Sequence, residues 1–267
     1  DHPLGGGLFP AGLTQADVAL LVGTKLGWTI AYGRPPIFHP DIKVIQVDIE
    51  PEEIGKNRPV DVGIPGDAGA VLAQLRQALQ GKPKITDDWA KTIKAMISGV
   101  RGQFAGDIRK AGSPVHPARL AQEVREVLPR DAALVIDGGD IALFANILLD
   151  ALSLGSLMWV GGFGHLGVGI PYAIAAKLAH PQRKVAVLTG DGSIGFSLME
   201  FDTAVRHCIP IVCVVSNDGG WGQIRRGQIA KYGRDRVIGC ELGLRPYHKI
   251  VEAMGGYGEY VERTEDV

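Results

Sequence analysis

Residues 184–193 read Lys-Val-Ala-Val-Leu-Thr-Gly-Asp-Gly-Ser, and this stretch decides the fold. A short apolar run that stops at glycine is typical of a buried parallel strand, so we predict a strand that ends at Gly190. Gly190 and Gly192 let backbone N–H groups approach a phosphate closely, and the Ser193 hydroxyl adds a donor. Asp191 supplies a hard anionic oxygen of the kind that Mg²⁺ prefers.

A second strand of the same kind is predicted over residues 209–216, directly before Asn217. Between Gly192 and Asn217 lie 24 residues, which is enough for one helix and one strand. This is one βαβ step, so Asn217 is expected at the neighbouring strand end, beside Asp191. We predict metal ligands at Asp191, at the amide oxygen of Asn217 and at the backbone carbonyl of Gly219.

A third predicted strand, residues 132–136, runs into Asp137-Gly138-Gly139-Asp140. Ligands of open parallel sheets bind at the carboxyl ends of the strands, so the three polar loops are expected to meet at one site. Gly139 and Asp140 are therefore further candidates for the diphosphate end. An acid so near a phosphate repels it unless Mg²⁺, water or backbone donors lie between them.

The alternation of strand and helix patterns occurs twice along the chain, which predicts an α/β protein with two parallel, doubly wound sheets. The pattern breaks at Gly81-Lys82-Pro83-Lys84. We expect one domain over 1–82, a connecting helix and linker over 83–112, and a second domain over 113–267. The last residues look like the start of a helix, so we expect the second domain to be truncated at its C-terminal end.

Composition and charge narrow the classes of protein. Apolar residues make up 46% and charged residues 21%, and the net charge of −1 favours neither a nucleic acid nor an acidic membrane as a partner. No apolar run reaches the roughly 18–20 residues that cross a bilayer. The three cysteines, Cys208, Cys213 and Cys240, have no metal-like spacing. They predict a reducing compartment, which we interpret as the cytoplasm.

Gly190-Asp191-Gly192 together with Asn217 resembles the diphosphate signature of thiamine diphosphate (ThDP) enzymes. Residues 200–206 and 216–224 are similar to the branch that holds acetolactate synthase, 2-hydroxyacyl-CoA lyase and benzaldehyde lyase. In this likeness residues 113–267 correspond to the diphosphate-binding (PP) domain. Gly33-Arg34-Pro35-Pro36 and residues 46–51 resemble the later part of the central domain, so the likeness covers nearly the whole chain.

The resemblance also implies roles for two residues of the segment 162–169. In the family a bulky apolar side chain bends ThDP into a V shape, and here it would be Leu166. The carbonyl of Gly164 would accept a hydrogen bond from the 4′-amino group of the aminopyrimidine. Without the surrounding glycines, an ordinary core leucine is an equally good interpretation of Leu166.

Three further residues are candidates, and two of them have a second interpretation. Relatives bind FAD or ADP in the central domain, so the resemblance implies Asp48 and Ile49 as contacts to such a nucleotide, with Asp48 on the ribose hydroxyls. A helix-capping acid is the alternative for Asp48. Trp221 follows the Asn217 loop and either lines a substrate channel or packs beneath that loop.

The activity implied by the resemblance is a ThDP- and Mg²⁺-dependent C–C bond lyase or carboligase acting on 2-oxoacids or 2-hydroxyacyl-CoA. Oxalyl-CoA decarboxylase-like and benzaldehyde lyase-like enzymes are alternatives, although Ala142 stands where benzaldehyde lyase has a tyrosine. A second class of function is a non-catalytic Mg²⁺–diphosphate or nucleotide-binding module, or a regulatory paralogue.

The resemblance leaves one part of the family's machinery without a counterpart. No segment resembles the pyrimidine-binding (PYR) domain, whose glutamate activates the cofactor. The resemblance therefore implies that this chain alone is inactive and that a PYR domain comes from a missing N-terminal part or from another chain. It also implies a homodimer or homotetramer that acts on a small-molecule substrate.

Overall fold

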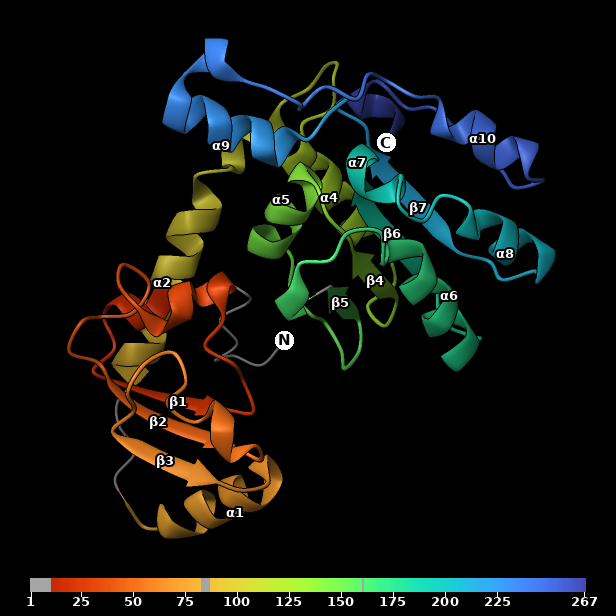
Figure 1. Ribbon diagram of the computed structural model, residues 1–267. Helices are drawn as coiled ribbons and strands as arrows, with labels where there is room; N and C mark the ends of the chain where they lie inside the picture. Colours follow the sequence, from red (N-terminus) through yellow and green to blue (C-terminus); the bar gives the residue numbers. More distant parts are fainter. Residues whose placement is uncertain (1–10, 83–86, 160) are drawn as a thin grey trace. The chain divides into compact units, whose positions relative to one another are not determined.

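The computed structural model describes residues 11–82, 87–159 and 161–267. The described chain divides at Gly99 into two compact units, each with its own parallel sheet (Figure 1). The division falls inside the helix α2 (Asp87–Gly102), within the segment 83–112 that we predicted as the connection. Of the predicted break at 81–84, residues 83 and 84 lie outside the described residues.

The smaller unit contains three parallel strands in the order β1-β2-β3. Its elements are η1 (Ala11–Thr14), β1 (Val18–Val22), η2 (Trp28–Gly33), β2 (Lys43–Asp48), η3 (Pro51–Glu53), β3 (Val62–Pro65) and α1 (Ala68–Ala78). Alternate residues of β1, Ala19 and Leu21, are buried with Val44 of β2 and with Phe38. Successive side chains of a strand point to opposite faces of the sheet, so every second residue of β1 belongs to this core.

Two local features shape this unit. The side chain of Asp67 accepts a hydrogen bond from the Ala70 N–H at 2.8 Å and so caps the start of α1. Pro51–Glu53 form only a single 3₁₀ turn, and the chain then turns back to form β3. That strand escaped prediction because four residues that include a glycine and a proline carry little strand signal.

The larger unit contains a four-stranded parallel sheet in the order β5-β4-β6-β7. The strands are β4 (Ala133–Ile136), β5 (Leu157–Trp159), β6 (Val185–Gly190) and β7 (Val212–Ser216). The three strands predicted from the sequence are therefore neighbours, and only β5 at the edge was not predicted. Its three residues are too short to show a period.

Helices cover both faces of this sheet. They are α3 (Ala105–Arg109), α4 (Pro117–Val127), α5 (Asp140–Leu148), η4 (Gly161–Phe163), α6 (Gly169–Ala179), α7 (Asp191–Ile194), α8 (Glu200–Arg206), α9 (Gly222–Tyr232), η5 (Arg234–Arg236), α10 (Tyr247–Ala253) and η6 (Thr264–Asp266). Leu134 and Leu188 pack with α4 and α5, whereas Val135 and Val187 pack with α6 and α8. Figure 1 shows α5 and α6 on opposite sides of the strands, so the doubly wound fold is confirmed here.

The predicted connecting helix is two helices, because the chain leaves the helical path after Gly102, a poor helix former, and resumes at α3. His116 caps α4, since its Nδ1 accepts a hydrogen bond from the Ala118 N–H at 3.2 Å. The ring of Phe144 lies edge-on to the imidazole, with the ring centres 5.3 Å apart. These contacts give His116 a structural role.

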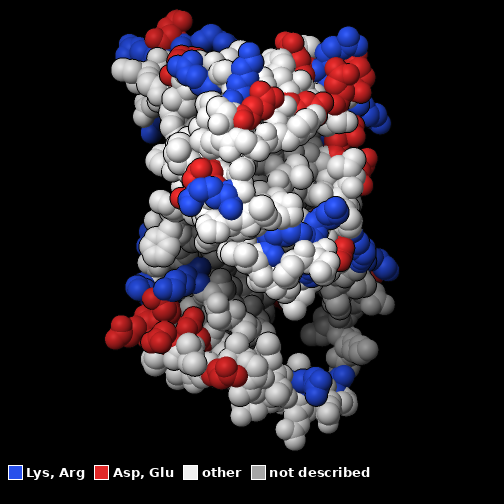
Figure 2. All heavy atoms as spheres, turned by 90° about the vertical axis from the view of Figure 1, so that its right-hand side faces the viewer, with Lys and Arg blue, Asp and Glu red and all other residues white. Residues whose placement is uncertain are grey.

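The charged side chains are mixed on the face seen in Figure 2, where lysine and arginine lie among aspartate and glutamate. This agrees with the net charge of −1. None of the helices within the described ranges has both the length and the apolar character needed to span a bilayer.

Candidate functional site

The predicted loops meet at the carboxyl ends of β4, β6 and β7. In the sheet Gly190 pairs with Ser216, so Asp191 and Asn217 each follow a paired residue on adjacent strands. The Gly190 N–H also donates to the Gly138 carbonyl at 2.9 Å. The βαβ spacing in the sequence therefore brought the two predicted ligands together, and a backbone hydrogen bond adds the loop after β4.

Three oxygen atoms at this edge are buried and have no hydrogen-bond partner within the described structure: Asp191 Oδ2, Ser193 Oγ and Asn217 Oδ1. More than about 90% of buried polar atoms in proteins have a partner, so a cluster of three is informative. The Asn217 Nδ2 group donates to the Arg245 carbonyl at 2.9 Å, which leaves Oδ1 as the free end of the amide. A carboxylate, an amide oxygen and a hydroxyl are the donor set that fits Mg²⁺ and a diphosphate.

The electrostatics of Asp191 also fit a cation. The pKa of its carboxyl is raised to about 6, first by burial and then by the nearby Asp218 carboxyl, which acts by its charge and by a side-chain hydrogen bond. The backbone N–H groups of Gly192 and of Asp191 itself act in the opposite direction. The Tyr247 hydroxyl donates to the Asp191 carbonyl at 3.2 Å, which fixes the turn from the other side.

Gly219, the third predicted ligand, is engaged elsewhere. Its carbonyl accepts the N–H groups of Leu242 at 2.8 Å and of Gly243 at 2.9 Å, which uses both lone pairs. Metal binding by this carbonyl requires one of these hydrogen bonds to break, and the role stays a prediction. Within the described residues no group of three His, Cys, Asp or Glu side chains is placed to hold a metal. The candidate site thus depends on one carboxylate and one amide.

Close packing explains two glycines of the site. A Cβ on Gly139, whose φ is +94°, would lie 2.9 Å from the Gly190 Cα. A Cβ on Gly192 would lie 2.5 Å from the ring of Trp221. The indole therefore lies directly on the Gly192 turn, which favours packing beneath the loop as the role of Trp221.

Leu166 and Gly164 lie in the segment between η4 and α6. The half-buried Leu166 side chain packs against Gly138, and so does Ser193 Oγ. A Cβ on Gly138 would clash with both. Leu166 is thus next to the diphosphate loops. Gly164 has a φ of +60°, and no hydrogen bond to its carbonyl occurs within the described part of the chain. Both placements are compatible with the roles implied by the resemblance.

The Asp140 carboxylate pairs with an arginine of α9. Its Oδ1 accepts a hydrogen bond from Arg226 Nη2 at 2.7 Å, and burial raises the pKa of its carboxyl while Arg226 lowers it. A second ion pair joins Asp218 to Arg225 at 2.9 Å. Asp140 thus links the first turn of α5 to α9, and its expected role at the diphosphate end stays a prediction.

Several residues of the site carry no sequence signal of their own. Asp218, Arg225 and Arg226 look like an ordinary charged helix start in the sequence, and Asp137 looks like a turn residue. The pairing of α9 with the loops after β4 and β7 gives Asp218, Arg225 and Arg226 their place, whereas backbone N–H groups of two loops place Asp137.

In the smaller unit, Asp48 is buried at the end of β2 and its Oδ1 accepts a hydrogen bond from the Glu50 N–H at 3.0 Å. This hydrogen bond closes a local turn before η3, but Asp48 is not the cap of that helix, because Glu50 holds the cap position and receives no side-chain capping bond. Ile49 is 68% exposed. The contacts to FAD or ADP remain a prediction for both residues.

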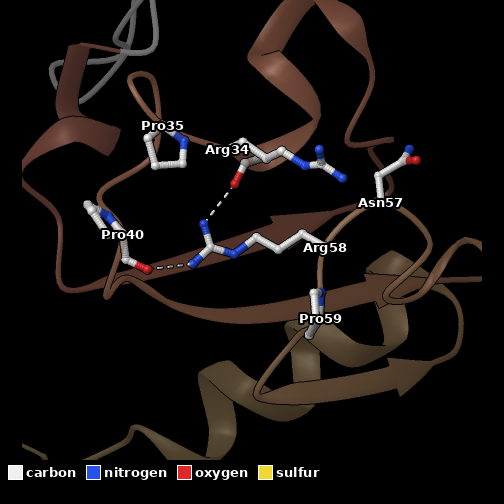
Figure 3. A pocket seen from close by; sticks show the side chains of 7 residues that line it. Arg34, Pro35, Pro40, Asn57, Arg58 and Pro59 are labelled. Atoms are coloured by element: carbon white, nitrogen blue, oxygen red, sulfur yellow. Dashed lines mark hydrogen bonds between the residues drawn. The ribbon is translucent and has the colours of Figure 1, made fainter.

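A separate cavity of about 380 Å³ lies in the smaller unit (Figure 3). It is lined by Gly33, Arg34, Pro35, Pro40, Asn57, Arg58 and Pro59. The Arg58 guanidinium donates to the carbonyls of Gly33 at 2.7 Å and of Ile42 at 3.0 Å, so it supports the wall of the cavity. Asp48 is not among the lining residues, so the cavity does not add to its predicted role.

Comparison with known proteins agrees with this geometry. Residues 137–267 match the C-terminal TPP-binding domain of thiamine pyrophosphate enzymes, and residues 10–75 match the central domain of the same enzymes. Thiamine pyrophosphate is another name for ThDP. The first match begins at the loop after β4 and contains every residue of the candidate site. The chain belongs to the thiamine pyrophosphate enzyme family.

Three curated relatives indicate the branch. The chain is 35% identical to 2-hydroxyacyl-CoA lyase 2 of Mus musculus, over 95% of the chain and 40% of that protein. It is 38% identical to acetolactate synthase large subunit IlvG of Mycobacterium tuberculosis, over 93% of the chain and 44% of the relative. It is 31% identical to 2-hydroxyacyl-CoA lyase of Arabidopsis thaliana, over 99% of the chain and 50% of the relative. The chain thus spans half or less of the length of these relatives.

Proposed function

We propose that the protein is a ThDP- and Mg²⁺-dependent lyase or carboligase that breaks or forms C–C bonds, and that this chain supplies its diphosphate-binding part. The observation that carries the proposal is the cluster of buried, unpartnered oxygens on Asp191, Ser193 and Asn217 at two adjacent strand ends. The relatives are named as acetolactate synthase and 2-hydroxyacyl-CoA lyase, which favours a 2-oxoacid or a 2-hydroxyacyl-CoA as substrate.

Each residue of the candidate site has its own role in holding the cofactor. Asp191 and Asn217 hold Mg²⁺ through side-chain oxygens, and the Ser193 hydroxyl donates to a diphosphate oxygen. Leu166 fixes the angle between the two cofactor rings, and the Gly164 carbonyl accepts from the 4′-amino group. When bound, ThDP supplies a carbon nucleophile and holds the electron pair of the broken C–C bond.

We further propose that a PYR domain, from another chain or another part of the protein, supplies the activating glutamate. Such an enzyme is a homodimer or homotetramer. A cytoplasmic location is part of the proposal, because Cys208, Cys213 and Cys240 are free thiols in the structure.

Calorimetric titration of the chain with ThDP tests the cofactor, in Mg²⁺ and in a chelator. We expect binding only with Mg²⁺, and Asp191→Ala should weaken it more than about 100-fold, because even groups behind a metal ligand contribute 10–100-fold. Asp150→Ala is the matched control, since this acid pairs with Arg101 outside the site. Wild-type affinity in Asp191→Ala would refute its role, and no binding by the wild type would refute the proposal.

Two assays of the protein combined with a PYR domain distinguish the substrates. One measures acetolactate formed from pyruvate, and the other measures aldehyde released from a 2-hydroxyacyl-CoA. Turnover in either assay supports the enzyme and names its substrate class. Tight ThDP binding without turnover of these or of oxalyl-CoA and aromatic acyloin substrates would favour the alternative, a non-catalytic Mg²⁺–diphosphate module.

A further inference from the structure

Asp137 is a buried acid at the end of β4 to which the proposed chemistry assigns no task. It is 1% exposed, and its own N–H donates to the Leu188 carbonyl of β6 at 3.0 Å. The sheet therefore fixes the backbone from which this carboxylate projects.

The carboxylate accepts three backbone N–H groups. Oδ1 accepts from Gly138 at 2.7 Å and from Gly167 at 3.1 Å, and Oδ2 accepts from Gly169 at 3.0 Å. Gly138 belongs to the loop after β4, whereas Gly167 and Gly169 belong to the segment that enters α6. One side chain thus ties together two loops that are 30 residues apart in sequence.

The tie also replaces a missing helix cap. Val168 occupies the cap position of α6 and makes no side-chain capping hydrogen bond. Asp137 Oδ2 satisfies the first N–H of the helix instead, and its negative charge lies at the positive end of the helix dipole. A Cβ on Gly169 would lie 2.9 Å from Asp137 Oδ2, so the close approach depends on glycine at that position.

Leu166 is the residue immediately before one of these anchored glycines. Its side chain packs against Gly138, another of the three glycines whose N–H groups donate to the Asp137 carboxylate. A single carboxylate therefore fixes both the backbone next to Leu166 and the glycine against which its side chain packs. This sets the position of Leu166 relative to Asp191 and Asn217.

We infer that Asp137 is a positioning residue, which holds Leu166 where it would meet the two cofactor rings without itself touching the cofactor. This inference rests on the proposed function, because it assigns Leu166 to ThDP. Asp191, Asn217 and Ser193 hold the diphosphate from the loops after β6 and β7. Asp137 reaches those loops mainly through the hydrogen bond from the Gly190 N–H to the Gly138 carbonyl, so it should matter more for the rings than for the diphosphate.

The test compares two ligands on the full 267-residue chain. Calorimetry with Mg²⁺ measures the affinity for inorganic diphosphate and for ThDP in the wild type and in Asp137→Asn, whose amide NH₂ group cannot accept the Gly169 N–H. In Asp137→Asn we expect the affinity for diphosphate to stay within about twofold of the wild-type value. The affinity for ThDP should fall at least about tenfold, which is the loss seen when a residue that orients a binding group is replaced.

Ser156→Ala is the matched control. Ser156 is also 1% exposed, and its Oγ accepts the N–H groups of Leu152 and Ser153, each at 3.0 Å, in the loop before β5. This variant loses a buried tie of the same kind away from the site, so its ratio of ThDP to diphosphate affinity should equal that of the wild type.

Equal losses for both ligands in Asp137→Asn, or no loss, would overturn the inference. If this variant does not fold, amide hydrogen exchange is measured in the wild type. The N–H groups of Gly167 and Gly169 should then be protected like the amides of β4. Exchange of these two amides at the rate of an open loop would overturn the inference. Two outcomes are distinguishable. A wild-type chain that binds diphosphate but not ThDP contradicts the proposed function. A wild-type chain that binds both, with the ratio of the two affinities unchanged in Asp137→Asn, contradicts only the inference about Asp137.

Discussion

At the residue scale, the Asp191 carboxyl combines burial with an acidic neighbour. Its pKa rises from 3.8 to about 6, because burial and Asp218 both disfavour the charged form. The folded chain therefore holds this proton more tightly than the unfolded chain does. The contribution of Asp191 to stability is present in full below about pH 4 and is lost as the pH rises through about 6.

Metal binding should show the opposite dependence on pH, because Mg²⁺ requires the carboxylate and displaces the proton. We expect the affinity for Mg²⁺ and ThDP to be constant well above pH 6 and to fall about tenfold per pH unit below it. Titrations from pH 5 to 8 measure this. Asp218→Asn should move the midpoint to lower pH, and comparing the two chains at each pH cancels the titration of the ligand itself. Identical profiles would contradict the coupling.

Gly139 allows the loops after β4 and β6 to touch. Its φ of +94° and ψ of −179° are nearly restricted to glycine, and Gly233 has the similar values +86° and 160°. Gly233 has nothing within 4 Å of a Cβ, whereas Gly139 has the Gly190 Cα at 2.9 Å.

We expect Gly233→Ala to lower the free energy of unfolding by about 1–3 kcal/mol through backbone strain alone. Gly139→Ala should lower it by about 1–3 kcal/mol more, because the extra methyl group has no space. Urea unfolding measures both variants. Equal losses would mean that the contact with Gly190 relaxes without cost.

At the element scale, α9 is attached to the sheet edge by its first arginines. The Arg226 guanidinium pairs with Asp140 and lies 5.5 Å from the centre of the Phe144 ring. Arg225 pairs with Asp218 and, at 3.3 Å, with Glu241. Charge pairs therefore hold the start of α9 next to the loops after β4 and β7.

Arg226→Met keeps the apolar stem over Phe144 and removes the charge. The side chain is 46% exposed, so we expect a loss of stability of about 1 kcal/mol or less, together with faster amide hydrogen exchange throughout α9. Mass spectrometry after exchange measures this, with Arg234→Met in the neighbouring η5 as control. Unchanged exchange in α9 would show that the ion pair does not hold the helix.

The strands that the sequence predicted are apolar runs that stop at a glycine or at a polar loop. β4, β6 and β7 follow from these runs and their stops. β3 and β5 did not follow, because β3 contains a glycine and a proline, β5 has only three residues, and the sheet neighbours of both strands stabilise them. The single helix expected across residue 102 was wrong because a glycine there ends it.

At the scale of the whole molecule, the candidate site draws all of its residues from the larger unit. ThDP with Mg²⁺ at 100 times its dissociation constant should stabilise that unit by about 2.7 kcal/mol. The slowest amides of the sheet β4–β7 should therefore exchange about 100-fold more slowly, while those of β1–β3 stay unchanged. Equal slowing in both sheets would show that cofactor binding is not confined to the larger unit.

By itself, the sequence determined the two parallel sheets and the pair of Asp191 and Asn217, because strand periods and a βαβ step depend only on local spacing. Only the tertiary structure decided how the acids are used. It pairs Asp140 with Arg226, engages the Gly219 carbonyl with two N–H groups and turns Asp137 into the tie between two loops. These roles depend on contacts between segments far apart in the chain, which no local pattern encodes.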